Sequence, residues 1–333
     1  MSSNVIVTLS DRNYMDQAKQ LFSSIYYNSG WKGDYLLLGQ GIFDDEKKWF
    51  TDRGIIVRDI DPLRMENFLW LPGTVLGKFY LIDEWMRKWD QVLYIDADAT
   101  VGASLDPLTR LKGVWASPDF HCRKLRGQFL EPRMLGNDPK KKDALERLTM
   151  SFDTNAISFN SGVMLFETRS LPEDPFTRSI ELYRDLEPIV LHDQSIFNLL
   201  FYGIWNHLPL AYNNYHLYKR DPWSISFMKC EGVIDHYVLD KVWKTRNRDY
   251  YPRWRNLLDK ADMIDLAKRP DASRTLTDDE VARISRRLSI STPRRDRISN
   301  MFHGSARVVD RSLGLIGRKL RKTSPGLYRM IRK

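Results

Sequence analysis

The sequence feature that most constrains the fold is the run Val92-Leu93-Tyr94-Ile95-Asp96-Ala97-Asp98. Its first four residues are β-branched, aromatic or aliphatic, which predicts a buried β-strand. Two aspartates separated by one small residue follow, and ligands of open α/β sheets bind beyond the carboxyl ends of strands. Carboxylate oxygens suit Mg²⁺ or Mn²⁺, and substrate phosphates often complete their coordination. We therefore expect a metal and diphosphate site here; the alternative is a strand end followed by a polar turn.

Alternating strands and helices precede this run. The predicted strands cover Val5–Leu9, Tyr35–Leu38 and Gly54–Ile60, and the predicted helices cover Tyr14–Ile25, Asp44–Thr51 and Thr74–Trp89. Such alternation predicts an α/β fold with a mainly parallel sheet and helices on both faces. The first turn carries no glycine-rich fingerprint, so neither a P-loop nor a dinucleotide-binding motif is supported. Lys78 falls in the last helix, where it is either a solvated lysine or a phosphate ligand.

The segment after Asp98 is less regular. Residues Asp119–Phe159 are too long and too polar for an ordinary connection, so we expect a loop and a helix that cover the site and govern specificity. A surface insertion without such a role is the alternative. Phe159-Asn160-Ser161-Gly162 predicts a small polar turn before the strand Val163–Phe166. This turn could hydrogen-bond sugar hydroxyls or be a plain turn.

Two further candidate side chains lie at a helix start and in a late strand. A predicted helix covers Phe176–Leu186, and the next begins at His192-Asp193-Gln194. The carboxylate of Asp193 could act in the site or simply cap that helix. His236 falls in the predicted strand Gly232–Val238, where a lone histidine is more often structural than a ligand.

The positive charge is concentrated at the carboxyl end of the chain. The formal net charge is +9, and residues 269–333 contain 17 Lys/Arg and 6 Asp/Glu, a net of +11. The preceding 268 residues therefore carry about −2, so the basic balance belongs to the tail rather than to the site. A nucleic-acid-binding role is disfavoured because the tail lacks the aromatic interleaving of single-strand platforms.

Length and composition suit one large domain with an extension. The chain has 333 residues, of which 42% are hydrophobic. Its start does not resemble a secretory signal, and no apolar run is long enough to span a bilayer. Cys122 and Cys230 are far apart and lack metal-type spacing, as expected of reduced thiols. We therefore expect a cytoplasmic protein.

Several short motifs resemble, in the same order, those of the family 8 glycosyltransferases, and of glycogenin-type enzymes in particular. The resemblance covers about residues 4–245, and each motif is short while the ordered set is specific. The motifs are Val7-Thr8-Leu9-Ser10-Asp11-Arg12-Asn13-Tyr14, Gly77-Lys78-Phe79-Tyr80, Tyr94-Ile95-Asp96-Ala97-Asp98, Phe159-Asn160-Ser161-Gly162-Val163, Asp193-Gln194-Ser195, Leu208-Pro209 with Tyr212-Asn213, and Ile234-Asp235-His236-Tyr237.

The resemblance implies a single Rossmann-like GT-A domain, a UDP-sugar donor and a divalent cation, usually Mn²⁺ with Mg²⁺ as the other option. It also implies transfer with retention at the anomeric carbon. By resemblance, Asp96, Asp98 and His236 are metal ligands, and Asp193 and Gln194 are the catalytic pair beside the anomeric carbon. The donor-binding residues that it implies are Thr8, Leu9, Asp11, Tyr14, Lys78, Asp96, Ala97, Asp98, Asn160, Ser161 and Lys241.

One departure from the family pattern follows the histidine motif. The family usually continues His-x-x-Gly-x-x-Lys-Pro-Trp, whereas here the chain continues from His236 to Lys241-Val242-Trp243 without the glycine and the proline. The lysine comes one residue early, so Lys244 is a rival for the phosphate role of Lys241. Glycogenin's self-glucosylation is not implied.

The leading hypothesis is a Mn²⁺-dependent retaining glycosyltransferase that moves a hexose-type sugar from a UDP-sugar to a glycan, lipid-linked or protein acceptor. The alternative is a catalytically inactive sugar-nucleotide-binding or scaffolding protein. The intact set of charged site residues argues against that alternative. The sugar, the acceptor and the oligomeric state, including a homo-oligomer, stay open.

We expect two parts, a catalytic domain over residues 1–260 and a basic helical extension over residues 261–333. Helical spacing covers Asp278–Ser291 and Ile298–Leu320, with basic residues interspersed. A basic amphipathic helix without a spanning segment lies in the plane of an anionic membrane surface. The tail therefore suggests peripheral attachment to the inner face of a membrane. The alternatives are a disordered tail, or a helix that packs on the catalytic domain or a partner.

Overall fold

The computed structural model describes residues 3–63, 76–119, 124–129, 139–186, 191–215, 231–238, 241–246 and 250–289. The chain divides into two compact units, Met1–Ser285 and Arg286–Lys333. The first unit extends beyond residue 260, where the sequence suggested that the catalytic domain ends. Buried side chains explain this extension, because Ile264, Leu276 and Ile284 are each less than 9% exposed.

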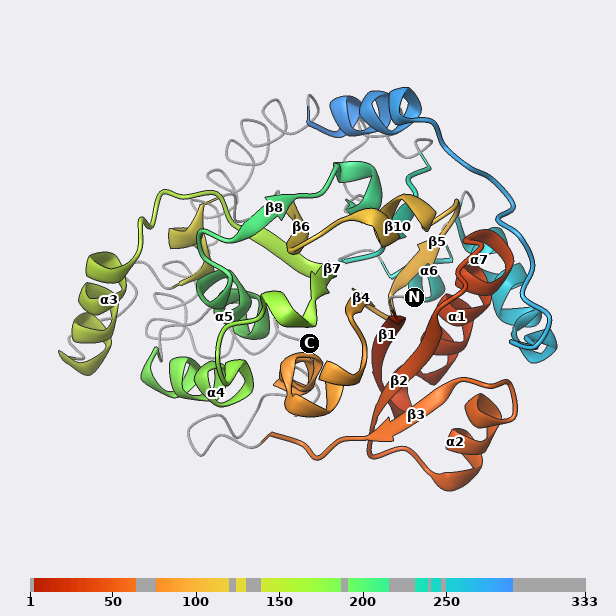
Figure 1. The fold of residues 1–333 in the computed structure, drawn as a ribbon, viewed down its shortest axis with the longest axis horizontal. Helices are drawn as coiled ribbons and strands as arrows, with labels where there is room; N and C mark the ends of the chain where they lie inside the picture. The colour runs from red at the N-terminus through yellow and green to blue at the C-terminus, as the bar shows by residue number, and fades with distance from the viewer. Residues whose placement is uncertain are drawn as a thin grey trace, which may run out of the picture. The chain divides into compact units, whose positions relative to one another are not determined.

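The described residues form a seven-stranded sheet in the order β3-β2-β1-β4-β7-β6-β8, which runs from bottom to top in Figure 1. Strands β1, β2, β3 and β4 are parallel, β7 is antiparallel to both β4 and β6, and β8 is parallel to β6. The expected α/β fold with a mainly parallel mixed sheet is therefore confirmed. The bounds of these strands are Asn4–Asp11 for β1, Asp34–Gln40 for β2, Ile56–Asp59 for β3, Gln91–Ile95 for β4, Val114–Pro118 for β6, Phe159–Glu167 for β7 and Trp205–His207 for β8.

Helices cover both faces of this sheet, and Figure 1 shows α1 on one side and α4 and α5 on the other. The central strand β4 is buried throughout, which is why its sequence is a continuous apolar run rather than an alternating one. Alternate side chains of β4 enter opposite layers; Val92 and Tyr94 join the core that Phe79 and Phe197 fill. The described helices are α1 Met15–Asn28, α2 Asp44–Thr51, α3 Pro139–Ser151, α4 Pro175–Asp185, α5 His192–Leu200, α6 Val242–Thr245, α7 Tyr251–Asp259 and a further helical stretch over residues 278–289.

The prediction of one continuous helix over Thr74–Trp89 is wrong. Its described part forms two short 3₁₀ helices, Leu76–Ile82 and Glu84–Lys88, interrupted at Asp83. Asp83 has an extended backbone (φ −79°, ψ 169°). Its Oδ1 accepts a hydrogen bond of 2.9 Å from Arg58 on β3. This ion pair draws the chain out of the helical path, and the sequence of the segment alone contains no sign of it.

The turn predicted at Phe159–Gly162 is also wrong, because these residues are the first part of β7. The strand pairs with β4 through Val163 opposite Ile95, and with β6 through Phe159 opposite Pro118. The register with β6 shifts between Ala116 and Pro118, opposite this segment, so β7 is irregular where its asparagine, serine and glycine have low strand propensity. The polar side chains of this segment nevertheless lie on β7 and not in a turn.

A second, three-stranded sheet has the order β5-β10-β9, with bounds Ala99–Val101, Ile234–His236 and Asn214–Tyr215. The late strand predicted over Gly232–Val238 is thus shorter than expected and belongs to this sheet rather than to the main one. Strand β10 is antiparallel to β5, with His236 opposite Ala99. Because β5 begins directly after Asp98, this pairing brings the late histidine to the two aspartates.

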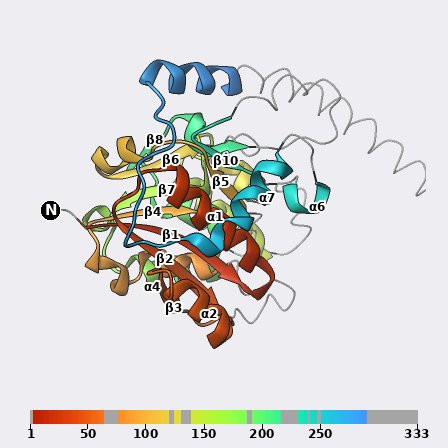
Figure 2. The ribbon, with the colours of Figure 1, turned by 90° about the vertical axis from the view of Figure 1, so that its right-hand side faces the viewer.

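The C-terminal part of the first unit packs beside its N-terminal helix. Figure 2 shows α7 next to α1, and Trp254 of α7 is 3% exposed. The helical residues 278–289 agree with the first helix expected in the tail, whereas the second one, Ile298–Leu320, lies outside the described residues. Cys122 and Cys230 also lie outside them. Within the described part of the chain, no helix combines the length and the apolar character needed to cross a membrane.

Candidate active site

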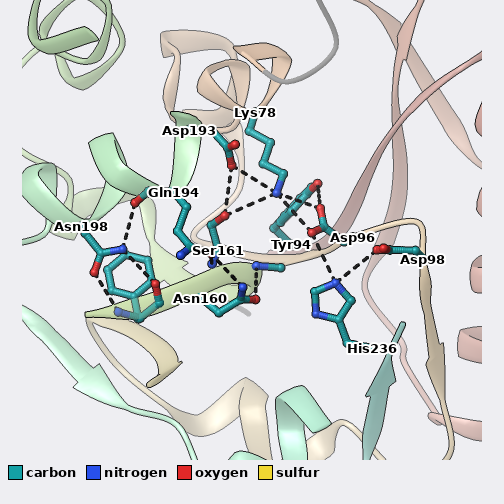
Figure 3. Close-up of polar contacts among 12 residues, drawn as sticks. Lys78, Tyr94, Asp96, Asp98, Asn160, Ser161, Asp193, Gln194, Asn198 and His236 are labelled. Atoms are coloured by element: carbon teal, nitrogen blue, oxygen red, sulfur yellow. Dashed lines mark hydrogen bonds and ion pairs between the residues drawn. The ribbon is translucent and has the colours of Figure 1, made fainter. Parts of the chain in front are cut away.

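Asp96, Asp98 and His236 form the centre of the candidate site. One ligand atom from each of these three side chains lies within 4.8 Å of the others. His236 Nε2 is 3.2 Å from Asp98 Oδ1 and 3.6 Å from Asp96 Oδ2 (Figure 3). The backbone fixes the arrangement, because the N–H of Tyr237 donates to the carbonyl oxygen of Asp98 at 2.9 Å. Two carboxylates and an imidazole nitrogen are a donor set that fits a divalent ion such as Mn²⁺.

Two lysines neutralise these carboxylates. Lys241 pairs with Asp98, so it is the lysine of the irregular histidine motif that reaches the aspartates. Burial alone would raise the pKa of Asp98, but His236 and Lys241 outweigh it and hold that pKa below its ordinary value. The carboxylate therefore stays ionised, as a metal ligand must be.

Lys78 connects the aspartate cluster to a second group of side chains. Its Nζ lies 2.9 Å from Asp96 Oδ1, 3.2 Å from Asp193 Oδ2 and 3.4 Å from Ser161 Oγ. Burial alone would lower the pKa of Lys78, but Asp193 and Asp96 outweigh it and hold that pKa above its ordinary value. Lys78 is thus a partly buried cation inside the site and not a solvated helix lysine.

Asp193 lies in the first turn of α5, yet its carboxylate points into the site. Its Oδ2 accepts a hydrogen bond of 3.0 Å from Ser161 Oγ and faces Lys78. The N-cap position of α5 belongs to Leu191, which makes no side-chain cap hydrogen bond. Asp193 therefore does not cap α5, and its side chain contacts Ser161 and Lys78 instead. The preceding residue, His192, has a left-handed backbone (φ 44°) and lies 3.2 Å from the Tyr183 hydroxyl.

Gln194 belongs to a buried group of amides behind the carboxylates. Its Oε1 accepts a hydrogen bond of 2.8 Å from Asn160, and its Nε2 donates to Asp119 Oδ2 at 2.6 Å and to Gln128 Oε1 at 3.2 Å. On the other side, Asn213 Nδ2 donates to Asn160 Oδ1 at 3.0 Å. Asp119 and Gln128 were not expected in the site from the sequence, and Asn213 stood in a family motif without an assigned role. Asp119 directly follows β6 as Asp96 follows β4, so the same strand-end rule could have found it.

The residues expected at the uridine edge lie at or after the carboxyl end of β1, next to β4. The Thr8 hydroxyl is buried and has no hydrogen-bond partner within the described part of the chain. Asp11 accepts a hydrogen bond of 2.9 Å from the N–H of Asn13, and the ring of Tyr14 lies 5.9 Å from that of Trp243. Leu9, like the others, makes no described contact with the aspartate cluster. These residues therefore lie along β1 and the turn that follows it, and no described hydrogen bond or ion pair links them to the aspartate cluster.

Two small residues make room around the aspartates. Ala97 separates the two carboxylates and is 6% exposed. A Cβ built on Gly162 would lie 2.1 Å from His236 Cε1 and 2.7 Å from His236 Nδ1. His236 can therefore occupy its position only because β7 has no side chain at residue 162.

We predict that Gly162→Ala destabilises the protein, because the new methyl group and the imidazole of His236 cannot both fit. Overpacking of this kind costs about 1–3 kcal/mol. Urea unfolding of the unmodified protein, Gly162→Ala, His236→Ala and the double variant would measure it. We expect the cost of the alanine to shrink when the imidazole is absent, with an interaction energy of about 0.5–3 kcal/mol. Additive costs would show that the ring does not oppose a side chain there.

Comparisons with known proteins agree with this geometry. Residues 5–246 match the family described as Glycosyl transferase family 8. The chain is 24% identical over 233 residues to a lipopolysaccharide 1,2-glucosyltransferase of Escherichia coli, covering 63% of this chain and 64% of that protein. It is 26% identical over 276 residues to glycosyltransferase GlyD of Streptococcus pneumoniae, covering 75% of this chain and 30% of that protein. It thus spans less than two thirds of the length of either relative.

Solved structures share the fold. The bifunctional glycosyltransferase WbbM superposes with a TM-score of 0.58 at 18% identity, covering 80% of this chain and 52% of that one. An active-site mutant of LgtC superposes with a TM-score of 0.56 at 19% identity, covering 77% of this chain and 95% of that one. At such identities the likeness shows the fold alone. Because the family match spans most of the chain, this chain belongs to glycosyl transferase family 8 and has the GT-A fold.

Proposed function

We propose that this protein is a retaining glycosyltransferase that moves a hexose-type sugar from a UDP-sugar to a glycan, lipid-linked or protein acceptor with the help of Mn²⁺ or Mg²⁺. One observation carries the proposal. Lys78 joins two groups of side chains, the cluster of Asp96, Asp98 and His236 and the pair of Asp193 and Ser161. Its ammonium nitrogen lies within 3.4 Å of Asp96, Asp193 and Ser161. A sugar-nucleotide donor has a charged diphosphate that suits the aspartate cluster. It also has a sugar that suits the polar side chains around Asp193.

The aspartate side of the site would hold the diphosphate. Asp96, Asp98 and His236 would bind a divalent cation, which neutralises charge on a leaving diphosphate when it is bound. Lys78 and Lys241 bring two more positive charges to the same place. The protein thereby supplies cationic groups that can favour departure of UDP.

The sugar side of the site is polar and rigid. Asn160 and Ser161 lie on β7, Asp193 and Gln194 lie on α5, and hydrogen bonds between the two elements hold all four side chains (Figure 3). Hydroxyl and amide groups of this kind suit the hydroxyls of a hexose. The carboxylate of Asp193 supplies a negative charge that would stabilise positive charge developing at an anomeric carbon.

The alternative of an inactive sugar-nucleotide-binding or scaffolding protein predicts binding without turnover. The candidate site keeps its full charged set, with each carboxylate of the centre matched by a lysine. The lipopolysaccharide 1,2-glucosyltransferase that the chain resembles carries a glycan acceptor in its name. These observations favour turnover on a glycan acceptor over scaffolding.

A panel of UDP-sugars, each with Mn²⁺ or with a chelator, tests the proposal through the release of UDP. We predict that Asp96→Asn and Asp98→Asn abolish Mn²⁺-dependent release, because neutral amides are nearly isosteric but remove the charge that the cation requires. Glu167→Gln is the matched control, since Glu167 is a buried carboxylate on β7 that binds the N–H of Gly113 away from the site. Full activity of both aspartate variants would rule out the metal assignment. Donor binding without turnover in the unmodified protein would favour the scaffolding alternative.

We predict that Asp193→Asn lowers the turnover rate by about 10²-fold while UDP binding changes little, because the lost charge faces the sugar rather than the nucleotide. Donor affinity, UDP affinity and melting temperature are measured on the same variant. The amide can still accept the Ser161 hydrogen bond, so the fold should persist. Loss of stability with unchanged turnover would instead assign Asp193 a structural role.

We further propose that the protein acts in the cytoplasm at the inner face of an anionic membrane, through its basic tail. The net charge of +11 over residues 269–333 supports this, and each basic residue near such a surface contributes about 1 kcal/mol before screening. We predict that the full chain co-sediments with anionic liposomes, that salt weakens this binding, and that a chain ending at residue 289 loses it. The truncated chain should still release UDP. Equal liposome binding by both chains would exclude the tail as the anchor.

A further inference from the structure

A continuous hydrogen-bonded row of side chains runs through the site behind the carboxylates. His236 Nδ1 lies 2.9 Å from Asn213 Oδ1, and Asn213 Nδ2 lies 3.0 Å from Asn160 Oδ1. Asn160 Nδ2 donates to Gln194 Oε1 at 2.8 Å, and Gln194 Nε2 donates to Asp119 Oδ2 at 2.6 Å. From Asn213 onward, each amide in this order donates to the next group. The row links the imidazole of the aspartate cluster to the amides on the sugar side.

Backbone N–H groups of β7 fix the direction of this row. The N–H of Gly162 donates to Asn160 Oδ1 at 2.9 Å, and the N–H of Ser161 donates to Gln194 Oε1 at 3.2 Å. A backbone N–H can only donate, so the amide atoms that face these two groups must be carbonyl oxygens. The orientations of the Asn160 and Gln194 amides are therefore set by the main chain.

This direction determines which atoms of Asn213 face its two neighbours. Because Asn160 Oδ1 is an acceptor, the Asn213 atom beside it must be the NH₂ group. The carbonyl oxygen of Asn213 then faces His236 Nδ1, and the imidazole must donate a proton there. Asn213 is fully buried, and His236 is 2% exposed. At this depth an amide or imidazole group without a hydrogen-bond partner would destabilise the folded protein.

A neutral imidazole carries one proton, so the nitrogen that donates determines the nitrogen that can bind a cation. With the proton on Nδ1, the open lone pair of His236 is on Nε2. This is the nitrogen that faces Asp98 and Asp96. The opposite tautomer would place a proton between the imidazole and the cation site. Partners that orient a ligating histidine in this way typically change metal affinity by about 10–100-fold when they are removed.

We propose that Asn213 is the positioning residue that fixes the Nδ1–H tautomer of His236 and, through its other end, holds the Asn160 amide on the sugar side. One buried amide thus connects the cation ligand to the sugar-binding group. The proposal rests on the proposed function, because it treats His236 as a ligand of the divalent cation. In this proposal Asn213 contacts neither the cation nor the two aspartates. It acts through its hydrogen bond with His236.

Two substitutions distinguish the role of the Asn213 carbonyl group, which faces His236, from the role of its NH₂ group, which faces Asn160. Asn213→Leu keeps the same branched arrangement of side-chain heavy atoms and removes both the acceptor for His236 and the donor for Asn160. Asn213→Asp keeps an acceptor for His236 but has no donor for Asn160. Asn206→Leu is the matched control, since it removes a side-chain hydrogen bond of 3.1 Å from β8 to the carbonyl oxygen of Val114, outside the row.

Two measurements apply to each variant. Calorimetry with Mn²⁺ alone gives the affinity of the cation site. Imidazole ¹⁵N spectra in metal-free buffer show whether Nδ1 of His236 carries a proton, and a His236→Gln variant identifies its signals among the six histidines. The tautomer measurement needs no metal and no donor. It therefore tests Asn213 independently of the proposed function.

In the unmodified protein and in Asn206→Leu we expect His236 Nδ1 to carry a proton, whether or not Nε2 also donates one to the Asp98 carboxylate in the absence of a cation. Asn213→Leu should shift the proton to Nε2 and weaken Mn²⁺ binding by about 10–100-fold. Asn213→Asp should keep the Nδ1–H tautomer and bind Mn²⁺ at least as tightly as the unmodified protein, yet turn over a UDP-sugar more slowly. If Asn213→Leu fails to fold, Asn213→Asp still decides, because a change of tautomer in that variant would overturn the proposal.

An Nδ1–H tautomer and unchanged Mn²⁺ affinity in Asn213→Leu would also overturn the proposal. Failure of the proposed function looks different. In that case the unmodified protein and His236→Gln bind Mn²⁺ equally poorly, whereas the imidazole spectra still report whether Asn213 sets the tautomer.

Discussion

The ion pairs of Lys78 with Asp96 and Asp193 hold the site together. The ammonium group joins Asp96, at the end of β4, to Asp193, at the start of α5, and its own residue lies in a 3₁₀ helix. The end of β4, the start of α5 and the 3₁₀ helix thus meet at the ammonium group of Lys78. Both carboxylates contact one ammonium group, and its positive charge offsets the cost of withdrawing two negative groups from water.

Close backbone packing supports this charge balance. Gly162 leaves the space that His236 occupies, and the pairing of β5 with β10 places His236 beside Asp98. The same strand β7 presents the N–H groups that orient the amides of the sugar side. The main chain therefore positions both halves of the site, and the side chains need little freedom to reach their partners.

Much of the fold could be predicted from the sequence because its signals are local. The apolar run before Asp96 predicts a buried strand, and the helical spacing of Asp44–Thr51 predicts α2 with the bounds that the structure has. Errors arose where a distant partner decided the outcome. Arg58 interrupts the helix predicted around Asp83, and ladder pairing with β4 and β6 turns a predicted turn at Phe159–Gly162 into a strand.

The residue types available to the site are evident from the sequence alone. They include two carboxylates at a strand end, a lysine in the preceding segment and a histidine in a late strand. Only the tertiary structure decided which of them meet, that Asp193 faces Lys78 rather than capping its helix, and that Asp119 and Asn213 join the same network. The physical reason is that charge pairing and hydrogen bonding act through space over a few ångströms, whereas these residues are separated by tens of positions along the chain.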